Sequence, residues 1–127
     1  MIQIKVPAAL HTLIKQMTLY APSNTCERVM YQWAQTVLTE AKRITPVDKG
    51  ILKGSLGVNV EIKGRKVEAE FFAGGPASSY AEIVHDNHEL NHAYPTQANF
   101  LGQPIENGVP ELEKAIQKAI EEELRKF

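Results

Sequence analysis

Apolar residues recur along the chain first with helical spacing, then with strand spacing, and then with helical spacing again. From Asn24 to Ile44 they return every three or four positions, which predicts one long amphipathic helix of about five turns over residues 24–44. Asn24 and Glu27 are spaced as a capping box, so we expect this helix to begin at Asn24. Its apolar stripe comprises Val29, Met30, Trp33, Ala34, Val37, Leu38, Ala41 and Ile44.

Residues 55–73 alternate between apolar and polar side chains, which predicts a β-hairpin. Gly64-Arg65 suits a two-residue turn with glycine at a position of positive φ. This turn places Ile62 opposite Val67 on the neighbouring strand. The register that follows places every apolar residue of the hairpin on one face of the sheet. That face comprises Leu56, Val58, Val60, Ile62, Val67, Ala69, Phe71 and Ala73.

The polar face of the hairpin carries three glutamates. In the predicted register Glu61 lies opposite Glu68, and Asn59 lies opposite Glu70. Like charges that face each other across two strands are mildly destabilising. This face is therefore either exposed to solvent or covered by a basic surface of a partner.

The two ends of the chain add shorter elements. Residues 2–6 alternate as a strand, and a helix with its apolar face on Leu10, Leu13, Ile14 and Met17 follows Pro7. A short helix is predicted near 79–85, followed by a polar loop. Residues 98–101 form a short apolar anchor before Gly102, Pro104, Asn107 and Gly108, which predict a break. The last amphipathic helix is predicted over 110–126.

Composition places the chain among ordinary globular domains. It has 127 residues, 43% of them hydrophobic and 23% charged, which suits a single domain over residues 1–127. No apolar run is long enough to cross a bilayer, and the first seven residues lack the layout of a signal peptide. Cys26 is the single cysteine, so the chain has no framework of internal disulfides. We expect its thiol to be packed in the core. The net charge of -1 argues against nucleic acid as the main ligand, but it permits a polar lumen through which DNA passes.

His88-Glu89-Leu90-Asn91-His92 matches the His-Glu-x-x-His pattern of zinc peptidases, in which two imidazoles hold zinc and the glutamate acts as general base. The motif lies between Asp86-Asn87 and Tyr94-Pro95, a polar context with helix breakers. A polar loop therefore fits this stretch better than a catalytic helix. We expect no metal site, no cofactor and no catalytic residues, because no nucleophile motif or phosphate-binding loop is present either.

The junction between the long helix and the hairpin reads Thr45-Pro46-Val47-Asp48-Lys49-Gly50-Ile51-Leu52-Lys53-Gly54-Ser55. Pro46 ends the helix, while Asp48 and Gly50 carry turn chemistry, so the stretch is at least a helix-to-strand connector. The pattern of Thr45, Pro46, Val47, Asp48, Gly50, Leu52 and Ser55 also resembles the signature of the tail-completion, or neck, proteins of long-tailed bacteriophages. Tyr80-Ala81 with Val84-His85, and Phe100-Leu101 before a terminal helix, resemble that family's later elements in the same order.

The resemblance covers residues 24–127, and the strand and helix within 1–22 would be an N-terminal extension. Departures from the family pattern are His85-Asp86 and the long loop rich in histidine and asparagine. The implied fold is α+β, with a small antiparallel sheet packed on the long helix. The implied function is that of a structural protein of the virion, which needs no enzyme activity and no membrane.

In the family's architecture such a subunit assembles with itself as a hexameric or dodecameric ring at the head–tail junction. The implied location is the neck or tail of the virion, and the host cytoplasm during assembly. The implied partners are connector or head-closure proteins on one side and tail terminator or tail tube proteins on the other. DNA passes through the ring without sequence-specific binding. Candidate contacts between subunits or with these partners are Glu61, Glu68, Glu70, Tyr80, Ala81, His85, His88, His92, Phe100 and Leu101.

Two alternatives stay open on the sequence alone. One is a small zinc metallohydrolase that uses His88, Glu89 and His92. The other is an intracellular binding module without any connection to a phage.

Overall fold

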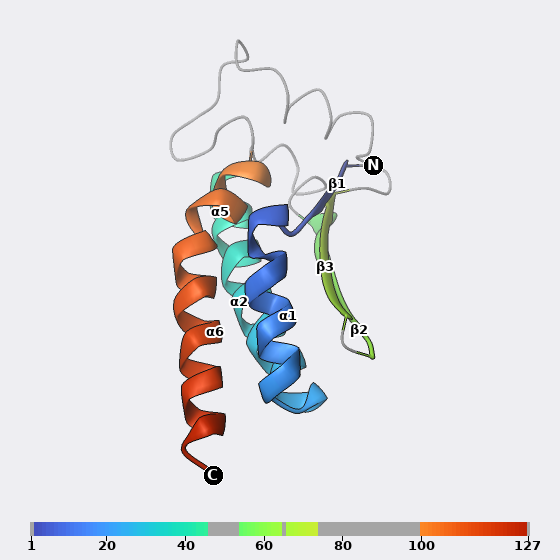
Figure 1. Cartoon of the computed structure of the whole chain (residues 1–127). Coiled ribbons are helices and arrows are strands. Elements are labelled where there is room, and N and C mark those ends of the chain that lie inside the picture. The colour runs from blue at the N-terminus through green and yellow to red at the C-terminus, as the bar shows by residue number, and fades with distance from the viewer. Residues whose placement is uncertain (1, 46–53, 65, 74–99, 127) are drawn as a thin grey trace.

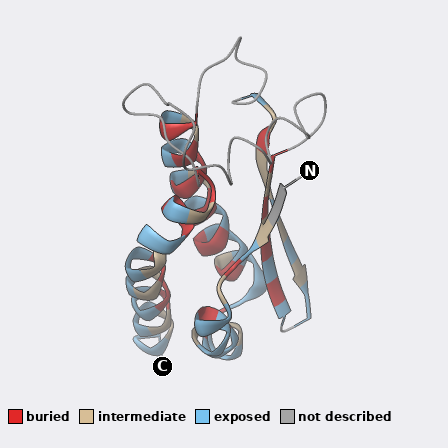
Figure 2. Cartoon of the chain, turned by 90° about the horizontal axis from the view of Figure 1, so that it is seen from above, coloured by how far each residue is buried: buried red, intermediate tan, exposed pale blue. Residues whose placement is uncertain are grey.

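The computed structural model describes residues 2–45, 54–64, 66–73 and 100–126. Its helices stand side by side along one face of a small antiparallel sheet (Figure 1). The sides of the helices and of the sheet that face one another are buried, and their outer sides are exposed (Figure 2). The predicted α+β fold class is confirmed. Among the described residues, no helix is long and apolar enough to cross a membrane.

The sheet has the order β1-β3-β2, with β1 at Ile2–Lys5, β2 at Leu56–Lys63 and β3 at Lys66–Ala73. The hairpin of β2 and β3 has the predicted register, from Leu56 opposite Ala73 to Lys63 opposite Lys66. Gly64 has a φ of 61°, the positive value that the turn chemistry required. The alternation of apolar residues therefore predicted both the pairing and the buried face.

The N-terminal strand and helix were also predicted correctly. Strand β1 pairs with the edge of β3 that β2 leaves free, with Ile4 opposite Phe71. A 3₁₀ turn at Ala8–Leu10 then leads into α1, His11–Tyr20. Leu10, Ile14 and Met17 are buried, whereas Leu13 is half-buried. The segment within residues 2–20 thus contributes a strand to the sheet and side chains to the core.

The long helix α2 spans Ser23–Ile44, and all eight residues of its predicted stripe are buried together with Cys26. Its start differs from the expectation: Pro22 is the N-cap, and the predicted capping box is wrong. The Pro22 carbonyl accepts hydrogen bonds from the backbone N–H groups of Thr25 and Cys26, at 3.0 and 3.1 Å. Asn24 lies inside the first turn, where its Oδ1 accepts from the Thr25 N–H at 2.9 Å. The bond to Cys26 is the first regular hydrogen bond of the helix, and the Pro22 carbonyl also accepts from the Thr25 N–H, which a capping side chain would otherwise have bound.

The predicted break after residue 101 is a helix, α5, over Gly102–Asn107, and the last helix α6 then spans Val109–Leu124. Pro104 is compatible with α5 because it lies in the first turn, where a backbone N–H has no partner within the helix. Gly108 adopts right-handed helical angles, with φ −83° and ψ −7°, and separates the two helices. The glycine and proline residues of this stretch therefore interrupt the helical structure less than their residue types alone predicted. The predicted short helix near 79–85 lies outside the described residues.

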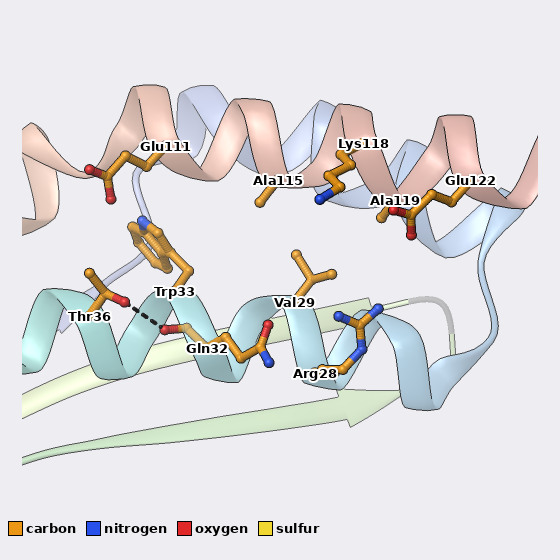
Figure 3. A pocket seen from close by; sticks show the side chains of 10 residues that line it. All are labelled: Arg28, Val29, Gln32, Trp33, Thr36, Glu111, Ala115, Lys118, Ala119 and Glu122. Carbon is orange, nitrogen blue, oxygen red and sulfur yellow. Dashed lines mark hydrogen bonds between the residues drawn. The ribbon is translucent and has the colours of Figure 1, made fainter.

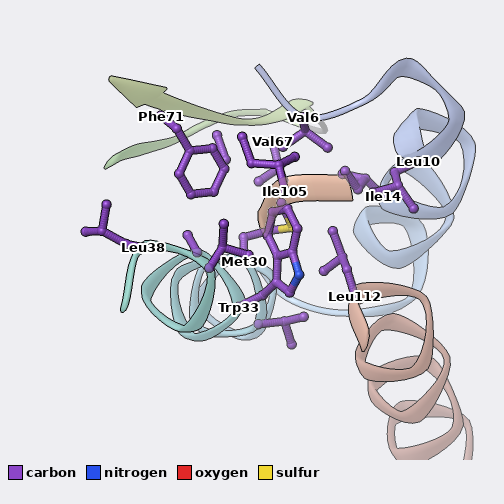
Figure 4. Packing of buried hydrophobic residues seen from close by; sticks show 14 of the residues in the cluster. Val6, Leu10, Ile14, Met30, Trp33, Leu38, Val67, Phe71, Ile105 and Leu112 are labelled. Carbon is purple, nitrogen blue, oxygen red and sulfur yellow. The ribbon is translucent and has the colours of Figure 1, made fainter. Parts of the chain in front are cut away.

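One core joins all of these elements. Side chains from the sheet and the helices point into a common interior (Figure 4). Trp33 and Phe71 meet edge to face, with ring centroids 5.8 Å apart and an interplanar angle of 81°. The indole Nε1 of Trp33 donates a hydrogen bond to the Gly108 carbonyl at 2.8 Å. This bond ties the middle of α2 to the start of α6.

Candidate interaction surfaces

Thr45, the first residue of the junction signature, has a structural role. Its side chain is fully buried at the end of α2. Both its backbone N–H and its hydroxyl donate hydrogen bonds to the carbonyl of Ala41. Ser55, at the end of the signature, is half-buried. The signature residues Pro46, Val47, Asp48, Gly50 and Leu52 lie outside the described residues.

The later candidate contacts divide into a buried pair and residues that are not described. Phe100 and Leu101 are fully buried, so they contact the core of their own subunit, as expected of an apolar anchor. Tyr80, Ala81, His85, His88 and His92 lie outside the described residues, as does Glu89. Within the described ranges, no group of three or more His, Cys, Asp or Glu side chains is arranged to hold a metal ion.

Each of the three glutamates on the outer face of the sheet lies beside a lysine. Lys63 Nζ is 3.5 Å from Glu61 Oε2, and Lys66 Nζ is 3.6 Å from Glu68 Oε1. The β1–β3 register places Lys5 opposite Glu70. The predicted pairing of Glu61 with Glu68 and of Asn59 with Glu70 is confirmed, but the lysines that lie beside these glutamates were not anticipated from the sequence. The outer face is therefore electrically mixed, and its exposed pairs each contribute little to stability.

A groove runs between α2 and α6 (Figure 3). Its volume is about 310 Å³, and its lining residues are Arg28, Val29, Gln32, Trp33, Thr36, Glu111, Ala115, Lys118, Ala119 and Glu122. We call this surface the α2–α6 groove. Val29 points toward α6, where the small side chains of Ala115 and Ala119 stand on either side of Lys118 (Figure 3). Two small residues four positions apart on one helix allow another segment to approach closely.

The α2–α6 groove continues into a second hollow of about 520 Å³, which shares the lining residues Thr36 and Glu111. Arg28 and Lys118 oppose the charges of Glu111 and Glu122 along the rim, so the groove has no net charge. An apolar floor with a mixed polar rim is typical of protein-binding surfaces. The sequence predicted the buried stripes of both helices but not this groove, because its width depends on how the two helices pack.

A second concave surface, which we call the α1–hairpin pocket, lies between α1 and the end of the hairpin. Its volume is about 440 Å³, and it is lined by His11, Ile14, Lys15, Lys63, Lys66, Val67 and Glu68. Ile14 and Val67 supply apolar surface, and three lysines and a histidine surround them. The helical pattern of α1 and the alternation in the hairpin were both visible in the sequence, but their juxtaposition was not.

Four large apolar side chains are about half exposed among the described residues: Leu19, Tyr20, Tyr31 and Leu124. Cys26, in contrast, is buried, as expected of a packed thiol, and its Sγ lies 3.7 Å from the Ala21 carbonyl oxygen. Burial raises the pKa of the Cys26 thiol, and the nearby Glu123 carboxylate also acts to raise it. Cys26 is therefore a poor nucleophile in the folded protein.

Comparison with known families gives a match to a bacteriophage family. A family model described as "Bacteriophage HK97-gp10, putative tail-component" matches residues 12–83, which is more than half of the chain. No curated protein and no solved structure matches the chain. The matched range contains α2 and the β2–β3 hairpin, together with the junction signature between them.

Proposed function

The chain belongs to the HK97-gp10-like family of bacteriophage tail components, and on this premise we propose that it is a neck protein which assembles as a ring at the head–tail junction. Membership makes the chain a structural tail component of a virion. The family match over residues 12–83 is the observation that carries the proposal. The order of sequence elements supports its finer part, because the junction signature lies between a long helix and a hairpin, as in tail-completion proteins.

The surfaces of the subunit are compatible with a role in assembly. Rings with cyclic symmetry are held by head-to-tail contacts between two unlike surfaces of each subunit. The α1–hairpin pocket and the α2–α6 groove are concave surfaces formed by different elements, and each could receive a protruding surface of a neighbouring subunit or of another neck protein. In the proposed neck, the ring lies between connector or head-closure proteins and tail terminator or tail tube proteins, and DNA passes through its lumen.

Deletion of the gene from its phage or prophage tests this role. We expect lysates in which filled heads and complete tails are present but separate, and in which infectious particles fall to background. The measurement is a count of joined and separate particles by negative-stain electron microscopy. Expression of the intact gene from a plasmid should restore joining, which controls for effects of the deletion on neighbouring genes.

The same complementation separates the neck protein from the zinc metallohydrolase that uses His88, Glu89 and His92. The variant Glu89→Gln keeps the size of the side chain but removes the general base. A neck protein with this substitution should restore joined particles as well as the wild-type chain does. Failure of Glu89→Gln to complement, with a soluble and folded variant, would favour the hydrolase. Joined, infectious particles without any copy of the gene would refute the neck role.

A further inference from the structure

We propose that Tyr31 and Glu27 of one subunit dock into the α1–hairpin pocket of the next subunit, where Glu27 pairs with Lys15. The occupant is a second copy of this chain, so the inference rests on the proposed ring. It deepens that function by naming the two surfaces that meet at each subunit boundary.

The charges of the pocket single out Lys15. Lys63 and Lys66 already lie 3.5 and 3.6 Å from Glu61 and Glu68. Lys15 lines the same pocket, is exposed, and forms no ion pair with any other described residue. The pocket therefore offers one cation that is not already neutralised, next to the apolar surface of Ile14 and Val67. A suitable occupant is an apolar or aromatic side chain with a carboxylate beside it.

Tyr31 and Glu27 have this chemistry. They stand four positions apart on α2, so they share one face of the helix. Tyr31 is 52% exposed, and Glu27 is exposed without an ion-pair partner among the described residues. Tyrosine combines a large apolar ring with a hydroxyl and is enriched in protein interfaces.

The two surfaces lie on different flanks of the subunit, as a head-to-tail contact requires. Val29 and Trp33 point toward α6 (Figure 3), and at 100° per residue Tyr31, two positions from each, projects from the opposite side of α2. It projects toward the flank where α2 packs on the edge strand β2. The pocket opens on the other flank, where α1 packs against β3.

The heights of the two surfaces also fit a closed ring. Tyr31 lies about 21 Å along α2 from Thr45, at 1.5 Å per residue. Ile62 lies about 20 Å along β2 from Leu56, at 3.3 Å per residue. Because α2 ends and β2 begins at the same end of the molecule, Tyr31 is level with the hairpin end that forms the pocket (Figure 1). With the helices along the ring axis, contacts at one height close a ring, whereas contacts at different heights produce a helical filament.

The other exposed apolar side chains fit this contact less well. Helix α6 runs past the end of the hairpin (Figure 1), so Leu124 lies at a different height from the pocket. Leu19 and Tyr20 belong to α1, the helix that forms the pocket itself. Of these four exposed apolar side chains, Tyr31 therefore fits the contact best. It lies on the flank opposite the pocket, at the same height along the helices, and next to the carboxylate of Glu27.

A charge-swap experiment tests the contact with the full-length chain. Lys15→Glu leaves both surfaces of a subunit negative, and Glu27→Lys leaves both positive, so each variant alone should remain monomeric where the wild type forms rings. A mixture of the two variants should form rings that contain equal numbers of both, because every boundary again joins opposite charges. The double variant Lys15→Glu/Glu27→Lys should also form rings. Native mass spectrometry gives the copy number and the ratio of the two variants.

Substitution of the aromatic side chain gives a second measurement. Tyr31→Ala should raise the protein concentration at which rings dissociate about tenfold or more, because a buried interface tyrosine is often a hot spot. Tyr20→Ala is the matched control, since Tyr20 is 50% exposed and should leave assembly unchanged. All four positions are on the surface, so circular dichroism and thermal unfolding of each variant should match the wild type.

The outcomes separate this inference from the proposed function. Rings that assemble unchanged from Lys15→Glu and from Glu27→Lys would overturn the contact and leave the neck role intact. Single variants that are monomeric but do not assemble when mixed would also overturn it, because the loss would then have another cause. A wild-type chain that stays monomeric at its highest soluble concentration would overturn the contact as well. The neck role is decided independently by the gene deletion.

Discussion

At the scale of single residues, two aromatic side chains show how neighbouring groups restrict sequence. Phe72, on the outer face of the sheet, lies over Gly57 in the neighbouring strand. A Cβ atom added at Gly57 would be 2.5 Å from Cζ and 2.8 Å from Cε2 of this ring. A side chain at position 57 would therefore force the Phe72 ring to move, so the constraint on Gly57 comes from contact with this ring rather than from its own backbone angles.

The variant Gly57→Ala should lower the free energy of unfolding by about 1–2 kcal/mol, because the Phe72 ring must rotate off the strand. Urea unfolding followed by circular dichroism measures the change. Gly54→Ala is the matched control, since nothing lies within 4 Å of a Cβ added there. The double variant Gly57→Ala/Phe72→Ala should show almost no extra cost from the alanine at position 57. If Gly57→Ala lowered the free energy of unfolding by the same amount in the wild type and in the Phe72→Ala background, the contact between position 57 and the Phe72 ring would be contradicted.

Trp33 is the second such residue. Trp33→Phe should lower the free energy of unfolding by about 2 kcal/mol, because it removes a buried hydrogen bond to the Gly108 carbonyl and leaves the core underfilled. Chemical unfolding must be followed by circular dichroism, since the variant has lost the single tryptophan. Phe71→Leu in the same aromatic pair is a useful comparison, because it perturbs packing without removing a hydrogen bond. A cost for Trp33→Phe below a few tenths of a kcal/mol would show that the bond is unimportant.

At the scale of elements, the hairpin is set by its turn and its alternation, whereas the helix ends depend on their surroundings. Gly64 adopts positive φ between two strands of eight residues each. The start of α2 at Ser23 uses the Pro22 carbonyl instead of a side-chain cap. Local patterns thus predict an element well when its own backbone geometry requires particular residues. Local patterns predict the end of a helix less well, because several different groups can accept hydrogen bonds from the N–H groups of its first turn.

Substitutions at Gly64 test the turn. Gly64→Val should destabilise the protein by about 1–2 kcal/mol, since a β-branched residue is strained at positive φ. Gly64→Asn should cost clearly less, because asparagine tolerates the left-handed region. Thermal unfolding of both variants gives the ranking. Nothing lies within 4 Å of a Cβ added at Gly64, so a steric clash would not explain a difference. Equal costs would show that the turn relaxes to other angles.

At the scale of the whole molecule, the family match makes the chain a structural component of a phage tail. The family match spans α2 and the hairpin, and strand β1 completes the sheet from outside that range. Within the described residues, the α2–α6 groove and the α1–hairpin pocket are two concave surfaces, each formed by elements distant in sequence. Assembly is therefore the property to measure first on the intact protein.

Native mass spectrometry of the purified chain after equilibration with zinc should show a ring of six or twelve subunits without bound metal. The expectation follows from the proposed neck role, in which subunits contact one another and no metal is needed. Treatment with a chelator is the control and should leave the mass and the assembly unchanged. A monomer that still holds one zinc ion after treatment with the chelator would contradict the expectation. It would support the hydrolase with His88, Glu89 and His92.

The sequence by itself determined the elements whose geometry is local. The period of apolar residues predicted α2 and its buried stripe, the strand alternation predicted the register of β2 and β3, and Gly64 predicted the turn. The order of motifs indicated the phage family, which the family match confirmed. These features depend on backbone periodicity and on residues that few other conformations accommodate.

Only the tertiary structure decided how these elements meet. It placed lysines beside the glutamates of the outer face and formed a helix where glycine and proline predicted a break. It also placed Lys15 beside the hairpin end and left Tyr31 exposed on the opposite flank. Such features depend on packing between segments far apart in the chain, because burial and long-range contacts outweigh the small local propensities that a sequence pattern records.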